Sequence, residues 1–384
     1  MTRNNYHNNN DNHDSLSHAA SRACKHIDIG TAVLPQPLQA ESLYAATLQR
    51  EFNAIVVEHD LKWGPLLGEG QNDLNDIKCL GQYDFTQADI VVNWALQHDK
   101  KVKGHVLVWH VTSPPCLQQL TAEQLREHLQ RHIYTVMGYF RGRIRTWDVV
   151  NEALAPDGSL AENIFLQKLG PSYIEKCFRW AHQADPDAVL LYNDNKVEAI
   201  DTPKGDAFYH LLADLKAKQV PIHGCGMQGH FNAAGTGRNR PPTPRMLKQQ
   251  IRRLGDLGLT VNLSEVDVRT SRLENPVLET VAQKQIYHDL VVAALSEPSC
   301  DGIWLWGFSD KHTWVSHFYY DDQPLIFDED YQQKPSYYAL REAIASFGVG
   351  SVVGNGVLLE EDVNVHGNTW GHEWMQPEPE DEIC

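Results

Sequence analysis

Short apolar runs alternate with longer amphipathic segments along most of the chain. Each run has four to eight residues and is almost continuously apolar, which is typical of strands buried on both faces of a sheet. Eight such runs occur, at residues 27–32, 54–57, 102–109, 146–150, 188–192, 224–228, 260–263 and 302–306. The pattern therefore predicts eight strands with helical segments between them.

Two of the segments between these runs begin with residues that are typical of a helix N-terminus. Thr121-Ala122-Glu123-Gln124 has the spacing of a capping box and precedes an amphipathic stretch. Thr86 stands in a similar position before residues 90–98. Eight strands alternating with helices favour a single-domain α/β fold, the (β/α)8 TIM barrel. A doubly wound sheet is the alternative, but its usual G-x-G-x-x-G turn does not occur in this sequence.

Both ends of the chain differ in composition from this alternating region. Residues 1–26 are rich in Asn, His, Asp and Ser and lack periodic apolar positions, so we expect a disordered, flexible N-terminal tail. Residues 348–384 are expected to form a flexible acidic C-terminal tail. The domain itself is expected to span residues 27–347.

The charge balance narrows the classes of partner. The chain has 384 residues, with 33 Lys and Arg against 50 Asp and Glu, and a formal net charge of −17. This excess argues against nucleic acid or an anionic membrane as a partner, because both repel negative charge. Residues 351–384 hold eight acids and no Lys or Arg, so about half of the net charge lies outside the predicted domain.

Two kinds of targeting segment are not visible in the sequence. No apolar run approaches the about 18 residues that a membrane span needs. The N-terminus has no apolar segment after its single Arg, so it shows no secretory signal.

The seven cysteines are scattered and include no C-x-x-C pair, which gives no support to a zinc ribbon or a redox motif. We expect most of them to be buried thiols that act as small apolar side chains. They are Cys24, Cys79, Cys116, Cys177, Cys225, Cys300 and Cys384.

Polar or aromatic side chains end or follow seven of the eight apolar runs. In a TIM barrel the C-terminal ends of the strands converge on one face, where the active site lies. The repetition therefore predicts a site built from Glu58, His105, Trp109, His110, Asn151, Glu152, Asn193, Asp194, Gln228, His230, Glu265, Asp267 and Trp306.

The residue types at these strand ends indicate carbohydrate chemistry. The sequence has no G-x-S-x-G elbow, no P-loop and no H-E-x-x-H motif. Two carboxylates remain, Glu152 and Glu265, among amides, imidazoles and indoles. Paired carboxylates are what glycosidic cleavage needs, one to protonate the leaving oxygen and one to attack or to activate water. Indoles suit such a site because their flat faces pack on sugar rings.

Seven motifs follow one another in a fixed order. They are GHVLVWH at 104–110, WDVVNEAL at 147–154, LLYNDN at 190–195, VPIHGCGMQGH at 220–230, LSEVD at 263–267, WGFSDKHTW at 306–314 and PLIFDEDYQQKPSYYAL at 324–340. In this order they resemble glycoside hydrolase family 10, the endo-1,4-β-xylanases. The resemblance covers residues 27–347 and implies a catalytic barrel that hydrolyses internal bonds of xylan. Xylan or a xylo-oligosaccharide is then the partner, and no cofactor is implied.

The resemblance also implies roles for individual residues. Glu152 matches the acid/base and Glu265 the nucleophile of a retaining double displacement. The matched substrate-binding residues are Glu58, His59, Lys62, His105, Trp109, Asn151, Gln228, His230, Trp306 and Trp314. Among these, Asn151 matches the amide that binds the sugar 2-hydroxyl, and His230 matches the imidazole that orients the nucleophile. Glu58 and Lys62 match hydroxyl-binding groups one subsite beyond the reacting sugar.

The chain departs from the family pattern near that distal subsite. His59 stands where the family usually has Asn, and residues 64–80 form a longer and different loop. We expect both features to affect the distal subsite and to leave the reaction centre unchanged. A surface insertion is the simpler interpretation of the loop.

Three alternatives stay open at this stage. One is a metal-dependent barrel hydrolase with His105, His110, His230 and Asp267 as ligands, although clustered ligand motifs are missing. Another is a carbohydrate-binding protein that has lost catalysis. The third is a member of the same family that cleaves another polysaccharide. A polymeric substrate implies action outside the cell, whereas the sequence shows no export signal and predicts no oligomeric state.

Overall fold

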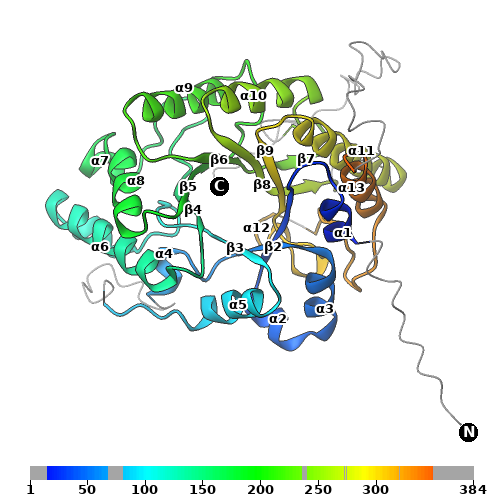
Figure 1. The fold of residues 1–384 in the computed structure, drawn as a ribbon, viewed down its shortest axis with the longest axis horizontal. Coiled ribbons are helices and arrows are strands. Elements are labelled where there is room, and N and C mark those ends of the chain that lie inside the picture. The colour runs from blue at the N-terminus through cyan, green and yellow to red at the C-terminus, as the bar shows by residue number, and fades with distance from the viewer. Residues whose placement is uncertain are drawn as a thin grey trace, which may run out of the picture.

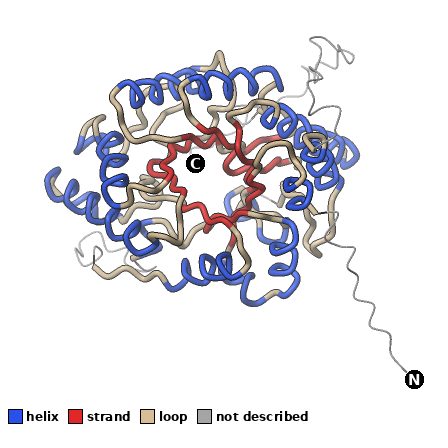
Figure 2. Tube along the Cα trace, in the orientation of Figure 1, coloured by secondary structure: helices blue, strands red, loops and turns tan. Residues whose placement is uncertain are grey.

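The fold is a closed barrel of parallel strands surrounded by helices (Figures 1 and 2). The computed structural model describes residues 15–67, 81–235, 240–271, 273, 275–319 and 321–348. The barrel strands are β1 Asp28–Val33, β2 Ala54–Val57, β3 Lys101–Gly104, β4 Thr146–Asn151, β5 Val189–Asp194, β6 Gly224–Met227, β8 Thr260–Arg269 and β9 Cys300–Leu305. Each pairs in parallel with its neighbour, and β1 closes the ring by pairing with β9. The predicted TIM barrel is confirmed, and each of the eight apolar runs contains or overlaps a strand.

Two strand ends differ from the prediction. The run at 102–109 is not one strand, because β3 ends at Gly104 and Val108 forms an isolated bridge to Val150. In contrast, β8 continues to Arg269, past the predicted end at residue 263. The polar residues after position 263 suggest the end of a strand in the sequence. They remain part of β8 because a short extra strand, β7 (His230–Asn232), pairs with this extension.

Helices cover the outside of the barrel (Figure 2). Those with α-helical geometry are α1 Leu16–Ser21, α2 Pro35–Ala40, α3 Ser42–Glu51, α4 Trp63–Leu66, α5 Thr86–Gln97, α6 Ala122–Phe140, α7 Ile164–Leu169, α8 Tyr173–Ala184, α9 Pro203–Ala217, α10 Pro244–Asp256, α11 Pro276–Leu295, α12 Val315–Phe318 and α13 Pro335–Ala345. Two 3₁₀ helices, η2 Pro115–Gln119 and η4 Asp310–His312, lie in the connections. No helix in the described part of the chain combines the length and apolarity of a membrane span.

Both predicted helix starts are confirmed, but only one of them has a capping box. Thr121 caps α6 in a complete capping box, since its hydroxyl accepts from the Gln124 N–H and the Gln124 side chain accepts from the Thr121 N–H. Helix α5 also begins where predicted, but Thr86 is its first residue rather than its cap. There the Asp84 carboxylate accepts a hydrogen bond from the Thr86 N–H at 2.8 Å.

The predicted boundary of the N-terminal tail at residue 26 is also wrong. Helix α1 packs on α3 and α13, and Leu16 is completely buried. The Leu16 N–H donates to the Glu51 carboxylate at 3.0 Å, and Ala23 pairs with Gly348. A helix of six residues is too short to show apolar periodicity, which explains the error. Residues 1–14 and 349–384, the rest of the predicted tails, lie outside the described residues.

The cysteines mostly follow the prediction. Cys177, Cys225 and Cys300 are buried free thiols, whereas Cys24 is free and exposed. Cys116 is instead disulfide-bonded. The two remaining cysteines, at positions 79 and 384, lie outside the described residues.

Glycines let large indoles pack closely against the barrel strands, Trp304 inside the barrel and Trp147 between the strands and α6. A Cβ at Gly30 would lie 2.0 Å from the Trp304 ring, and one at Gly104 would lie 2.2 Å from the Trp147 ring. Both glycines sit in strands, so the indoles of neighbouring strands lie directly against their backbones. Close packing on both the inner and the helix-facing sides of the strands makes their C-terminal ends a rigid platform.

The capping difference between α5 and α6 gives a direct test. Thr121→Ala removes a hydroxyl that caps α6 and should lower the free energy of unfolding by about 1 kcal/mol. Thr86→Ala is the matched control and should change it by less, because the N–H of residue 86 keeps its hydrogen bond to the Asp84 carboxylate. Urea denaturation followed by circular dichroism measures both variants, and equal losses would contradict the assignment of the caps.

Candidate active site

The two predicted carboxylates lie at the C-terminal end of the barrel. Glu152 directly follows β4, and Glu265 lies in the extended part of β8. Both residues are nearly buried: 6% of the surface of Glu152 and 4% of the surface of Glu265 is exposed. Carboxylates this buried need hydrogen-bond donors, and the neighbouring strands supply them.

Three amides link the two carboxylates. Gln228 Nε2 donates to Glu152 Oε1 at 2.8 Å and lies 3.2 Å from Asn151 Oδ1. Asn193 Nδ2 donates to the same Asn151 oxygen at 2.9 Å and to Glu265 Oε1 at 2.6 Å. These hydrogen bonds therefore connect the C-terminal parts of strands β4, β5, β6 and β8. Because the oxygen of Asn151 accepts both bonds, its NH₂ group is left to serve a ligand.

The backbone at Glu152 has an unusual conformation. Its φ is 54°, in the left-handed region that non-glycine residues rarely adopt. The Glu152 N–H donates to the Asn193 carbonyl at 3.0 Å, and Trp109 Nε1 donates to Glu152 Oε2 at 2.9 Å. This strained backbone conformation holds the Glu152 carboxylate where Trp109 and Gln228 both donate to it. Backbone strain of this kind is typical of functional sites.

Glu265 is held by an imidazole that a second carboxylate orients. His230 Nε2 lies 3.2 Å from Glu265 Oε2, and His230 Nδ1 lies 2.7 Å from Asp267 Oδ2. Trp314 Nε1 donates to the same Asp267 oxygen at 2.8 Å. The pairing of β7 with β8 places His230 opposite Asp267, so the unpredicted strand builds this contact.

The electrostatics of this group favour an ionised Glu265. Burial alone would raise the pKa of Glu265, but the hydrogen bond from His230 and the electrostatic influence of His105, His230 and Lys103 lower it to about 2. Burial would likewise lower the pKa of His230, but the charge of Asp267 and hydrogen bonds to Asp267 and Glu265 raise it to about 10. At neutral pH a carboxylate therefore faces an imidazolium.

His105 lies on the other side of Glu265. Its Nδ1 is 2.9 Å from Asp148 Oδ2 and 4.0 Å from Glu265 Oε1. The ring meets Trp306 edge-on, with centroids 5.0 Å apart. Asp148 thus orients His105 as Asp267 orients His230.

The predicted distal groups form a neighbouring cluster. The Lys62 ammonium lies 4.8 Å from the centroid of Trp109 and 5.5 Å from that of Trp306, within the range of cation–π attraction. Glu58 is buried, and burial raises its pKa to about 7 although the charge of Lys62 opposes the shift. His59, the residue after Glu58 in the sequence, is half-buried.

The structure brings together the predicted carboxylates, amides, imidazoles and indoles, and adds groups that the sequence analysis left without a role. Asn193 was named only as a strand-end residue, although it bridges Asn151 and Glu265. Asp148 was not named, because its position inside an apolar run gives no signal. Residues 68–80, most of the predicted insertion, lie outside the described residues.

The metal-site alternative finds no arranged ligand set in the part of the chain that the structure describes. No group of three or more His, Cys, Asp or Glu side chains there is positioned to hold a metal ion. His105 and His230 each direct one ring nitrogen at a carboxylate within 2.9 Å.

A TIM barrel with two buried carboxylates at its mouth and indoles around them defines a glycoside hydrolase. The sequence model described as "Glycosyl hydrolase family 10" matches residues 15–343. The chain belongs to this family. The match begins at residue 15, which agrees with the ordered helix α1.

Individual relatives are similar over most of the chain. Endo-1,4-beta-xylanase B of Thermotoga neapolitana is 37% identical over 303 residues, which is 78% of this chain and 82% of that protein. A beta-1,4-xylanase of Dictyoglomus thermophilum is 34% identical over 312 residues, 77% of this chain and 83% of its own length. The crystal structure of xylanase 10B from Thermotoga petrophila RKU-1 in complex with xylobiose has a TM-score of 0.78 and 34% identity. The structural match spans 86% of this chain and 97% of the chain in that crystal structure.

Proposed function

We propose that this glycoside hydrolase is a retaining endo-1,4-β-xylanase with Glu265 as nucleophile and Glu152 as acid/base. The names of its relatives supply the substrate, and the surroundings of the two carboxylates support their roles. The observation that carries the proposal is the contrast between them: Glu265 faces an imidazolium, whereas the donors to Glu152 among the described residues are a neutral indole and a neutral amide. The imidazolium keeps Glu265 ionised, whereas Glu152 has no cationic hydrogen-bond donor among the described residues.

In the first step, Glu265 attacks the anomeric carbon and forms a glycosyl-enzyme. Glu152 gives its proton to the glycosidic oxygen, so the departing chain leaves as an alcohol. Because His230 holds the outer oxygen of Glu265 and Asn193 the other, the carboxylate is oriented before the sugar arrives.

In the second step, Glu152 takes a proton from water, which attacks the anomeric carbon and releases Glu265. The configuration at that carbon is therefore retained overall. The free NH₂ of Asn151 binds the sugar 2-hydroxyl, and this contact strengthens as charge develops on the ring. Glu58 and Lys62 bind hydroxyls of the next sugar, against the walls made by Trp109 and Trp306.

The nucleophile is tested by Glu265→Gln, which keeps the shape of the side chain and removes its charge. We expect kcat on xylan to fall by about four orders of magnitude, because no glycosyl-enzyme can form. Release of reducing ends measures the rate. Glu329→Gln, at an exposed loop position, is the control and should keep full activity. Turnover near normal in Glu265→Gln would sink the assignment.

The acid/base is tested by comparing two leaving groups. Glu152→Ala should lose hydrolysis of xylan, which needs a proton on the departing sugar oxygen. It should still form the glycosyl-enzyme rapidly from a dinitrophenyl xylobioside, because that phenolate leaves without a proton. A burst of dinitrophenol in stopped-flow absorbance is the expected result. Equal loss on both substrates would count against Glu152 as the acid.

A further inference from the structure

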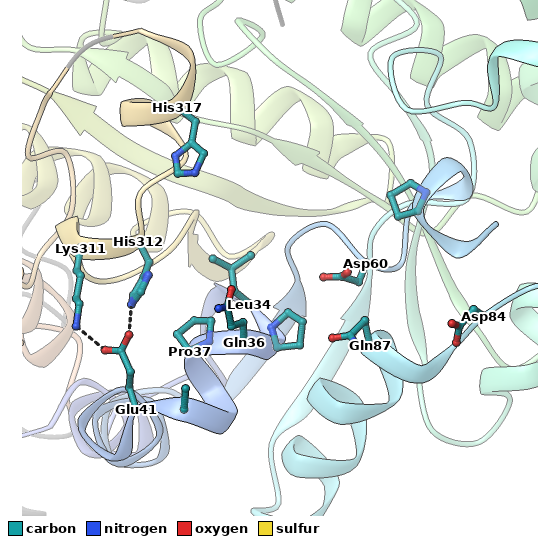
Figure 3. A pocket seen from close by; sticks show the side chains of 13 residues that line it. Leu34, Gln36, Pro37, Glu41, Asp60, Asp84, Gln87, Lys311, His312 and His317 are labelled. Carbon is teal, nitrogen blue, oxygen red and sulfur yellow. Dashed lines mark hydrogen bonds and ion pairs between the residues drawn. The ribbon is translucent and has the colours of Figure 1, made fainter. Parts of the chain in front are cut away.

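A pocket of about 600 Å³ lies beside the distal cluster, on the face where the strands end (Figure 3). Its lining comes from the connection after β1, helix α2, the segment after β2, the start of α5 and the region of η4 and α12. The volume falls in the range of small-ligand sites. None of its lining residues belongs to the predicted catalytic or substrate-binding set.

One wall of the pocket is fixed by an ion cluster. Glu41 accepts hydrogen bonds from Lys311 Nζ at 2.8 Å and Tyr331 OH at 2.6 Å, and lies 2.9 Å from His312 Nε2. Hydrogen bonds from Lys311 and Tyr331 lower the pKa of Glu41 to about 2. The one Lys of the lining is therefore already matched by a carboxylate.

The opposite side is polar and acidic. Asp60, Asp84 and Gln87 stand there in Figure 3, across from Glu41. The lining thus holds three carboxylates against one Lys, with two imidazoles besides. Apolar faces of Pro35, Pro37, Pro65 and Leu34 lie between the polar groups.

This combination suits a neutral polyhydroxylated ring. Carboxylates and amides accept and donate hydrogen bonds to hydroxyls, while prolines pack on C–H faces. The negative balance disfavours an acidic ligand. Asp60 lies two residues from both Glu58 and Lys62, so a chain bound at the distal cluster can continue toward the pocket.

We propose that this pocket binds a further neutral sugar unit of the substrate and discriminates against units that carry a uronic acid. The proposal rests on the proposed function of the barrel as a polysaccharide hydrolase. On this proposal, selection for long, uncharged substrates takes place at α2 and the start of α5 rather than at the reaction centre.

The test fills the pocket without touching the reaction centre. Gln36→Trp projects from α2 into the lining, whereas Gln39→Trp on the same helix is exposed and does not line the pocket. We expect Gln36→Trp to lower kcat/KM for linear xylohexaose about fivefold, the value of one or two lost hydrogen bonds. Neither variant should change kcat/KM for an aryl xylobioside, and Gln39→Trp should match the wild type on xylohexaose.

Charge discrimination is measured with the same enzymes plus Asp84→Asn. That variant should raise kcat/KM for glucuronosyl-substituted xylo-oligosaccharides relative to unsubstituted ones. Equal changes on short and long substrates, or no change in Gln36→Trp, would overturn the pocket's role. A wild-type protein that cleaves neither xylohexaose nor the aryl xylobioside would instead refute the proposed function.

A second inference comes from a buried ammonium group in the barrel. Lys103 of β3 is only 1% exposed, and its Nζ has no hydrogen-bond partner among the described residues. Nζ lies 3.7 Å from Asp148 Oδ2 and 4.7 Å from the centroid of Trp304. The charge of Lys103 also acts on Asp301 of β9, where it opposes the rise in pKa that burial causes. A buried charge without hydrogen bonds is costly to keep, so its retention needs a reason.

The reason lies along a line of contacts toward Glu265. The Asp148 oxygen beside Lys103 is also the one that His105 contacts, and His105 lies 4.0 Å from Glu265. Burial opposes ionisation of Glu265, and the charge of Lys103 is among those that lower its pKa against this effect. We infer that Lys103 is a positioning residue that supplies the counter-charge for Asp148 and keeps the Asp148–His105 pair aligned on Glu265.

Lys103→Met keeps most of the side-chain volume and removes the charge. Because Glu265 must be ionised to attack, the acid limb of kcat/KM for an aryl xylobioside should move up by about one pH unit. KM at the optimum should change little. Lys103→Arg should restore the acid limb toward that of the wild type.

The double variant Lys103→Met, Asp148→Asn removes both charges and covers the case in which the single variant does not fold. Its acid limb should lie closer to that of the wild type than the limb of Lys103→Met. An unchanged acid limb in folded Lys103→Met would overturn the inference. So would a double variant displaced further than the single one.

Discussion

The arrangement of the barrel mouth depends on one constraint: carboxylates that are buried there must each be met by a donor or a counter-charge. Glu265, Asp267 and Asp148 are all nearly inaccessible to water. Imidazoles of His230 and His105 lie between them, so that acidic and basic side chains alternate across the site. Amides close the remaining gap toward Glu152. Removing any one member takes a hydrogen-bond or charge partner from a buried neighbour, which explains why so many polar groups are concentrated there.

The sequence was enough to predict the barrel and the two carboxylates because both leave local signals. An apolar run of four or more residues is visible wherever it occurs, and a polar residue at its end marks the active face. Asn193 could be seen at such an end but not given a role, because its partners are 42 and 72 residues away. Asp148 and Lys103 lie inside strands, where a charged residue reads as an exception rather than as part of a network.

Other features could not be predicted because they depend on tertiary contact. The short strand β7 has no apolar run of its own and exists because β8 extends beside it. Helix α1 is one and a half turns long and is held by the Glu51 carboxylate and the surface of α13. Thr86 and Thr121 have the same local appearance, but Thr121 caps its helix, whereas Thr86 is the first residue of its helix and donates its N–H to the carboxylate two residues earlier. In each case the local sequence is compatible with more than one structure, and a contact with a residue outside the segment determines which one forms.

The contact between the first and last described segments has a consequence for engineering. Glu51 accepts hydrogen bonds from the Leu16 N–H and from Tyr337 OH, and Ala23 pairs with Gly348 where the chain enters and leaves the barrel. This seam precedes β1, so it lies at the face opposite the strand ends that form the site. Residues 23 and 348 are close enough for a short linker to join them, which makes the domain a suitable subject for circular permutation. New termini opened in a connection on that same face would lie away from the strand ends that carry Glu152 and Glu265, and so would a module joined next to residue 23 or 348.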